Sequence, residues 1–214
     1  MPTTFPLPRP PRAVLFDLDG VLVDTFDAWV AVLDECRARR GLPPLGPEPV
    51  RRTWGQGILA DCHSFFPGED PARLALEYDL GFRRHLGRVR LTPGVRELLH
   101  ALLLADVPAA VVTNSPRGLT GRILRDHGIA DLFAAVACGD EVPRGKPDPA
   151  VVHLALGRLG TGPEGTVLVG DTSLDVEAGR AARIPVVGFR IHGGDARVDA
   201  MEELYELLAI PRHR

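Results

Sequence analysis

Two carboxylates, Asp17 and Asp19, follow a short apolar run and are separated by a single residue. In open α/β sheets, ligands bind outside the carboxyl ends of the strands, so a strand ending at Asp17 would place both side chains where chemistry is expected. Two carboxylates held together repel each other, so a cation must bind them or one must carry a proton. Either outcome is useful in catalysis, although such a pair taken alone is more commonly a solvated turn.

Lys146 is the only lysine among 25 lysine and arginine residues, and it lies in the run Gly145-Lys146-Pro147-Asp148-Pro149. Arginine has a broad planar head, whereas lysine places a compact point charge on a flexible stem. The one lysine therefore suggests a site that needs a small cation beside a phosphate or a carboxylate cluster. The alternative is chance, because a single lysine has to lie somewhere. Lys146 also precedes an expected helix N-terminus, where free N–H groups favour anions.

Two further polar segments follow apolar runs. Thr113 and Asn114 supply a hydroxyl and amide donors after one run, and Asp171 and Asp175 supply two more acids after another. Thr113 or Asp175 alone could equally well be a helix cap. The whole set, however, brings acids, a hydroxyl and the one lysine to a single edge of a sheet, which coincidence explains poorly.

The elements that must position these residues alternate between short apolar runs and helical patterns. Five runs are typical of buried parallel strands: residues 13–16, 109–112, 134–137, 166–169 and 185–189. Helices are expected from Thr92-Pro93 to Leu104, from about Arg117 to Gly128, and from Asp148-Pro149 to Gly160. This alternation predicts an α/β fold: a Rossmann-like, doubly wound parallel sheet wrapped by helices.

The interval from Asp17 to Thr113 is far longer than one β-α-β unit requires. It contains helical patterns over residues 26–40 and 71–86 but no convincing strand, and four prolines between residues 43 and 49 indicate a loop. We expect residues 25–91 to form a helical lid, inserted into a catalytic core of residues 13–24 and 92–214. The proline-rich residues 1–12 are expected to form an extended tail.

The composition argues against several functional classes. The net charge is −3 and the basic residues are dispersed, so we expect no nucleic-acid partner. No apolar run approaches the length of a membrane span, and the N-terminus lacks the apolar segment of a signal peptide. The three cysteines are scattered, which is typical of reduced thiols. We expect a soluble, cytoplasmic protein, for which the sequence indicates no particular oligomeric state.

Four motifs together resemble a known family. Asp17-Leu18-Asp19-Gly20-Val21, Thr113-Asn114, Gly145-Lys146-Pro147 and Gly170-Asp171 with Asp175 match, in order, the four signatures of the haloacid dehalogenase-like (HAD) superfamily. The resemblance covers residues 13 to about 190 and is greatest to the phosphoglycolate-phosphatase-like branch. The expected lid occupies the position typical of members that carry a helical cap.

The resemblance implies a phosphatase that acts on a small phosphorylated metabolite. Asp17 would attack phosphorus to form an aspartyl-phosphate, and Asp19 would protonate the leaving alkoxide and then activate the hydrolytic water. Mg²⁺ would bind Asp17, the backbone carbonyl of Asp19, and Asp171. Asp175 is a further candidate for the metal site, more in orienting the metal's waters or Lys146 than in ligating directly.

The same resemblance assigns the phosphate-binding groups. Thr113, the backbone N–H of Asn114 and Lys146 would hold the phosphoryl oxygens as charge shifts in the transition state. Gly20 would let the chain turn sharply after the acidic pair.

Differences from other branches of the family narrow the expected chemistry. Family dehalogenases lack an acid two residues after the nucleophile, so Asp19 favours phosphate over halide. Phosphonatase-like relatives use a lid lysine, and residues 25–91 contain none. Mutases of the β-phosphoglucomutase kind carry a lid histidine where this chain has Trp29. A pyrophosphatase of the same family is the second hypothesis, and a non-catalytic phosphate-binding or phosphoacceptor module is an alternative from another class.

Substrate contacts from the lid are expected around the Gly55-Gln56-Gly57 turn. A lid excludes bulk water and limits substrate size, which favours small metabolites. The candidates are Arg51, Arg52, Trp54, Gln56 and His63. An arginine pointing inward would suit an acidic substrate such as phosphoglycolate. The alternative for the arginines is a solvated helix face, and for Trp54 it is the core of the lid.

Overall fold

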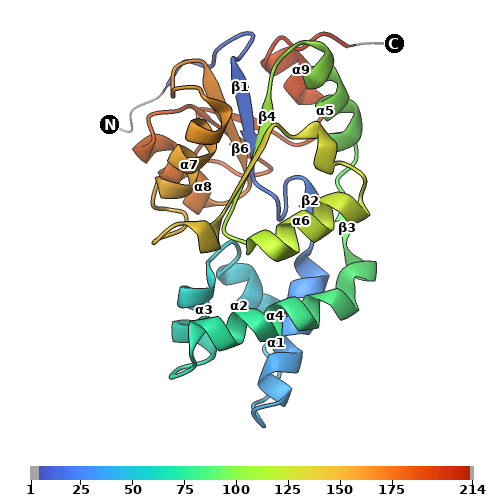
Figure 1. Ribbon diagram of the computed structural model, residues 1–214, viewed down its shortest axis with the longest axis vertical. Helices are drawn as coiled ribbons and strands as arrows, with labels where there is room; N and C mark the ends of the chain where they lie inside the picture. The colour runs from blue at the N-terminus through green and yellow to red at the C-terminus, as the bar shows by residue number, and fades with distance from the viewer. Residues whose placement is uncertain (1–4, 213–214) are drawn as a thin grey trace.

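The computed structural model describes residues 5–212, and its centre is a six-stranded parallel sheet in the order β5-β4-β1-β6-β7-β8 (Figure 1). The strands are β1 (Ala13–Phe16), β4 (Ala109–Thr113), β5 (Ala135–Cys138), β6 (Thr166–Gly170), β7 (Val186–Phe189) and β8 (Ala196–Val198). The predicted α/β class and its five buried strands are confirmed. The edge strand β8 was not expected, because it is short and only partly buried.

Helices cover both faces of the sheet, since successive strand residues point to opposite sides. Val14 and Phe16 belong to one apolar cluster, together with α5 (Val95–Leu104), α6 (Arg117–Asp126) and α9 (Glu203–Leu207). Leu15 belongs to a second cluster with α7 (Ala150–Leu159) and α8 (Ser173–Ala181). Figure 1 shows α7 and α8 on one side of the sheet and α5 and α9 on the other. Both faces of the central strands are therefore shielded from solvent.

Three of these helices match the expected ones, with one shifted start. Helix α6 is followed by Gly128, and α7 is capped by Gly160 in a left-handed conformation, as the sequence predicts. Helix α5 begins at Val95, two residues after Pro93, where the sequence predicts its first turn. Gly94 at φ 81° precedes its first turn, so Thr92-Pro93 lies outside the helix.

Residues 26–88, between β1 and α5, form a group of helices below the sheet in Figure 1: α1 (Phe26–Ala38), α2 (Pro47–Arg52), α3 (Ile58–Phe65), α4 (Pro71–His85) and the 3₁₀ helix η1 (Leu86–Arg88). The helices expected over residues 26–40 and 71–86 are α1 and α4, which pack through Trp29 and Phe82 with ring centroids 4.9 Å apart. The loop expected around residues 43–49 is wrong at its end, because Pro47 and Pro49 lie in the first turn of α2. Proline is tolerated there since the first N–H groups of a helix have no intrahelical partner.

A two-stranded antiparallel sheet joins the chain segments on either side of the lid helices. Strand β2 (Val23–Asp24) pairs with β3 (Arg90–Leu91), with Val23 opposite Leu91. The expectation of a lid without strands is therefore wrong at residues 90–91. The division into a core and a lid of residues 25–91 stays a prediction.

Residues 5–12 contain no helix or strand but are held along the core. The Phe5 N–H donates to Asp195 (2.8 Å), and the Arg12 N–H donates to the Gly165 carbonyl (2.7 Å). Residues 1–4 of the expected tail lie outside the described residues.

Two further observations bear on the composition. Within residues 5–212, no helix has both the length and the apolar character that crossing a membrane requires. Cys36, Cys62 and Cys138 are all free thiols, and all are buried.

Candidate active site

Lys146 joins two of the predicted acidic residues beyond the carboxyl ends of the central strands. Its ammonium nitrogen lies 2.8 Å from Asp17 Oδ1 and 2.6 Å from Asp175 Oδ1, and it donates to the Val112 carbonyl at 3.1 Å. The side chain is 2% exposed. Burial alone would lower the pKa of Lys146, but the two adjacent carboxylates outweigh burial and raise it. The ammonium therefore stays charged, and all three of its N–H donors have protein acceptors.

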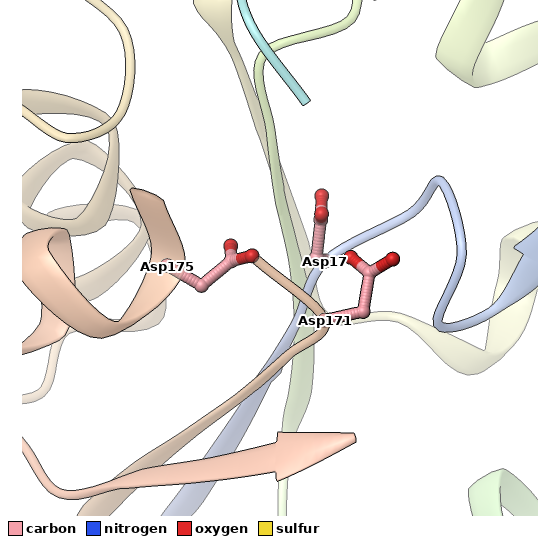
Figure 2. A group of neighbouring side chains, drawn as sticks. All are labelled: Asp17, Asp171 and Asp175. Carbon is pink, nitrogen blue, oxygen red and sulfur yellow. The ribbon is translucent and has the colours of Figure 1, made fainter. Parts of the chain in front are cut away.

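Three carboxylates gather at this edge of the sheet (Figure 2). Asp17 follows β1, Asp171 follows β6, and Asp175 lies in the first turn of α8. One oxygen of each lies within 4.8 Å of the others. Burial and the neighbouring acids raise the pKa of Asp17 well above its usual range, although Lys146 opposes them. The single positive charge of Lys146 therefore does not balance the charge of the three carboxylates.

Asp171 supplies the clearest ligand atom for a cation. Its Oδ1 is buried and has no hydrogen-bond donor among the described residues, while Oδ2 accepts from the Trp54 indole N–H at 3.1 Å. Burial, followed by repulsion from Asp175, raises the pKa of Asp171 to about 7. A buried acceptor without a donor is costly unless a ligand satisfies it. Carboxylate oxygens are the ligands that Mg²⁺ prefers, so these residues fit a magnesium ion.

Gly20 is required by the close packing around Asp171. It adopts φ +85°, and a Cβ at this position would lie 2.0 Å from Asp171 Oδ2. The sequence-based role of a sharp turn therefore has a second reason, which is the space that the carboxylate occupies.

Asp175 has both carboxylate oxygens engaged by the protein. Oδ1 contacts Lys146, and Oδ2 accepts from the backbone N–H (3.0 Å) and hydroxyl (2.7 Å) of Thr172, the N-cap of α8. These contacts fix Lys146 relative to the first turn of α8. They support the expectation that Asp175 orients its neighbours more than it ligates a metal.

Asp19 accepts hydrogen bonds from three side chains that the sequence analysis did not assign to the site. Thr25 (2.5 Å) and Trp29 (3.2 Å) donate to Oδ1, and Ser115 (2.7 Å) donates to Oδ2. Ser115 directly follows the Thr113-Asn114 motif, which is a signal that could have identified it. Thr25 shows no such signal. Trp29 is noted in the sequence only as the residue where the mutases carry a lid histidine, and only folding of α1 over the core brings Thr25 and Trp29 to Asp19.

Thr113 at the end of β4 and Asn114 directly after it make different contacts. The Thr113 hydroxyl accepts from the Ser115 N–H (3.0 Å) and is buried. The Asn114 side chain instead bridges three segments: its amide donates to the carbonyls of Gly55 (2.9 Å) and Lys146 (3.0 Å), and its oxygen accepts from the Lys146 N–H (2.7 Å). Asn114 therefore ties the lid turn to the lysine loop.

A cavity of about 450 Å³ lies between the sheet edge and the lid helices. On the sheet side, the cavity is lined by Asp17, Asp19, Thr113, Asn114 and Lys146. On the lid side, the lining is mainly apolar and contains Leu33, Val50, Ile58, Leu59, Phe65 and Ala75. The volume is in the range of pockets that enclose small organic ligands.

The structure brings two of the five lid candidates to this cavity. Trp54 and Gln56 line it, together with Asp61 and Tyr78, which sequence patterns did not reveal. Arg51 is not among the lining residues; it is exposed, and its guanidinium lies 4.4 Å from the centre of the Phe26 ring. Arg52 and His63 are also exposed and outside the lining. The solvated-face alternative describes these arginines better than substrate binding.

Comparison with known proteins agrees with the order of the motifs. The family model "Haloacid dehalogenase-like hydrolase" matches residues 14–189, which is most of the chain. The chain belongs to this family. Residues 14–189 contain all four motifs and the lid helices, so this HAD-like hydrolase carries the family pattern in one continuous match.

Curated relatives of this HAD-like hydrolase are phosphatases. It is 34% identical to N-acetylmuramic acid 6-phosphate phosphatase of Pseudomonas aeruginosa, over 92% of this chain and 94% of the relative. It is 35% identical to phosphoglycolate phosphatase of Pseudomonas putida, over 83% of this chain and 69% of the relative.

Solved structures agree on the fold. A predicted phosphoglycolate phosphatase from Haemophilus somnus superposes with a TM-score of 0.75 at 26% identity, over 92% of this chain and 97% of that one. CbbY from Rhodobacter sphaeroides, solved in complex with phosphate, gives a TM-score of 0.79 at 23% identity, over 91% of this chain and 96% of that one. At this identity the second likeness shows the fold alone.

Proposed function

We propose that this HAD-like hydrolase is a Mg²⁺-dependent phosphatase that hydrolyses a small phosphomonoester through an aspartyl-phosphate at Asp17. The observation that carries the proposal is the buried Asp17–Lys146–Asp175 contact beside an Asp171 oxygen that has no donor among the described residues. Asp17 and Lys146 of this group line the cavity between the sheet edge and the lid helices. The phosphatase relatives support the same reaction class.

Asp17 is oriented for nucleophilic attack. Its Oδ1 accepts from the Leu18 N–H (2.7 Å) and contacts Lys146, so both protein partners lie on one oxygen. Oδ2 is left as the oxygen that can form the new bond to phosphorus, while the bond from phosphorus to the leaving alkoxide breaks. Keeping one oxygen fixed holds the other in a narrow range of positions.

Asp19 is placed to move the proton. The hydroxyls of Thr25 and Ser115 can donate to the carboxylate or, after rotation, accept from the protonated acid. The pair can therefore support Asp19 both when it protonates the leaving alkoxide and when it takes a proton from the hydrolytic water.

The phosphoryl group would be held by the Thr113 hydroxyl, the Asn114 N–H and the positive charge of Lys146. Because the lysine donors already have protein acceptors, Lys146 acts mainly through its charge at short range. Asp17, Asp171 and the backbone carbonyl of Asp19 would hold Mg²⁺. When bound, the ion supplies electrostatic stabilisation of the phosphoryl oxygens as negative charge shifts onto them.

The test is phosphate release from a panel of phosphorylated metabolites, including pyrophosphate, with and without EDTA. We expect EDTA-sensitive release from phosphomonoesters, and none from Asp17→Asn, because an amide is a poor nucleophile. Asp126→Asn, an exposed change on α6, is the matched control and should retain activity. Preference for pyrophosphate would favour the pyrophosphatase hypothesis. Release from no compound would favour a non-catalytic phosphate-binding module.

A further inference from the structure

A second polar cluster lies on the lid side of the cavity, and the proposed chemistry does not use it. Asp61 of α3 accepts from the Gln56 side-chain amide through Oδ1 (2.6 Å) and from the Tyr78 hydroxyl through Oδ2 (2.9 Å). All three residues line the cavity, and Tyr78 of α4 is only 2% exposed. We call this group the lid acceptor cluster.

Burial makes the ionised form of Asp61 in this cluster energetically unfavourable. Burial raises the pKa of Asp61 to about 6, and the hydrogen bonds from Gln56 and Tyr78 only partly offset burial. No basic side chain of the described chain contacts this carboxylate. An ionisable group that lies in a cleft, has a pKa shifted by burial and forms no ion pair is a candidate for a functional role.

The lid side of the cavity offers almost no positive charge for an acidic leaving group. The basic residues among its lining are Lys146 and Arg144. The three N–H donors of Lys146 already have protein acceptors on the sheet side of the cavity. Arg144 is 80% exposed and paired with Asp148 (3.0 Å). A substrate carboxylate at this end would face the Asp61 carboxylate and an apolar wall.

The volume and the lining of the cavity also favour an uncharged leaving group larger than a two-carbon acid. The cavity of about 450 Å³ exceeds what a two-carbon acid needs to fill it. Apolar and aromatic walls with a few convergent acceptors suit a ring that presents carbon–hydrogen faces and hydroxyl edges. An Asp61 oxygen that already accepts one hydrogen bond keeps lone pairs for a further donor.

We propose that Asp61, held by Gln56 and Tyr78, is a specificity-determining acceptor that selects phosphate esters of an uncharged, hydroxyl-bearing ring of sugar size and disfavours leaving groups that carry a carboxylate. The proposal rests on the phosphatase function proposed above. In it, Asp61 accepts from a ring hydroxyl, while Gln56 and Tyr78 are positioning residues that fix the carboxylate.

The experiment compares kcat/KM for glucose 6-phosphate and N-acetylglucosamine 6-phosphate with kcat/KM for phosphoglycolate. We expect the wild-type protein to prefer at least one hexose phosphate. In Asp61→Asn that preference should fall at least about tenfold, since a hydrogen bond to a charged acceptor becomes a neutral one and repulsion of phosphoglycolate disappears. Tyr78→Phe should lower the same preference less, mainly through KM for the hexose phosphate. Asp79→Asn is the matched control and should keep the wild-type ratio, because Asp79 is 34% exposed, pairs with Arg83 and does not line the cavity.

The outcomes separate the two proposals. Wild-type preference for phosphoglycolate, or an equal loss on all substrates in both variants, would overturn the specificity role and leave the phosphatase intact. An equal loss would mean that the cluster only supports the lid structure. Failure of the wild-type protein to release phosphate from any substrate, including p-nitrophenyl phosphate, would overturn the phosphatase and the specificity role together. If Asp61→Asn does not fold, the substrate preference of Tyr78→Phe tests the specificity role in its place.

Discussion

Replacement of Lys146 by arginine keeps the charge but should damage both folding and activity. The ammonium nitrogen lies among three acceptors on three segments: Asp17 after β1, the Val112 carbonyl in β4, and Asp175 in α8. An ammonium directs its three N–H bonds outward from one atom, whereas a guanidinium spreads its donors in a plane. Arginine can therefore serve at most part of this set, and its longer head does not fit a side-chain site that is 2% exposed.

The expected magnitude follows from these two defects. A buried acceptor left without a donor costs about 1–3 kcal/mol, and the extra atoms of arginine in a packed site cost about 1–3 kcal/mol more. Together they lower the free energy of unfolding by about 2–6 kcal/mol, or roughly 5–20 °C in Tm for a chain of this size. A shift of Asp17 by about 1 Å would lower kcat by roughly 100-fold.

The assay for Lys146→Arg is thermal unfolding followed by circular dichroism, combined with kcat for release of phosphate. Arg122→Lys is the matched control, because Arg122 is 46% exposed and pairs with Asp126 on α6. The control should change stability by no more than about 0.5 kcal/mol. Wild-type Tm together with wild-type kcat in Lys146→Arg would refute the geometric reasoning and show that the one lysine is an accident of composition.

Three further changes test other parts of the site. Mg²⁺ at a concentration 100 times its Kd should add about 2.7 kcal/mol to the free energy of unfolding of the wild-type protein, and so raise its Tm, because the ion binds the folded state. Asp171→Asn should abolish this rise in a thermal scan, and an unchanged rise would exclude Asp171 as a ligand. Ser115→Ala should lower kcat for phosphate release about tenfold, since Asp19 Oδ2 loses its donor, and unaltered kcat would show that this contact is dispensable. Hydrogen bonds from Arg158 hold the pKa of Glu141 at about 2, so its ionised form stabilises the fold above the unfolded pKa near 4.5, and that contribution is lost as pH falls toward 2. Glu141→Gln should therefore cost about 1–3 kcal/mol in urea unfolding at pH 7, allowing for its partial exposure, and less at pH 4; an equal cost at both pH values would contradict this linkage.

Local patterns were sufficient for the core of the molecule. Short apolar runs that are bounded by turn residues and alternate with helical patterns are typical of parallel strands buried on both faces, so β1, β4, β5, β6 and β7 were predictable. The predicted site residues Asp17, Asp171, Asp175 and Lys146 meet because the carboxyl ends of parallel strands, and the loops that follow them, share one edge.

The lid was harder to predict. Helix α2 begins with prolines, which resemble a loop in the sequence, and α3 is short with a broad apolar face. Strands β2 and β3 contain two residues each, too few for any period to be visible, and they form because the two ends of the lid lie side by side.

The sequence by itself therefore determined five of the six strands of the sheet, the family, and the acidic and basic groups at the sheet edge, because these depend on residue type and on spacing along one strand or loop. Only the tertiary structure decided which lid residues face the cavity. It placed Arg51 over Phe26 and brought Asp61 and Tyr78 inward, from two helices whose relative rotation no local pattern specifies. Side-chain direction across an interface is set by the packing of whole helices, such as α1 against α4, and that packing is a property of the folded chain.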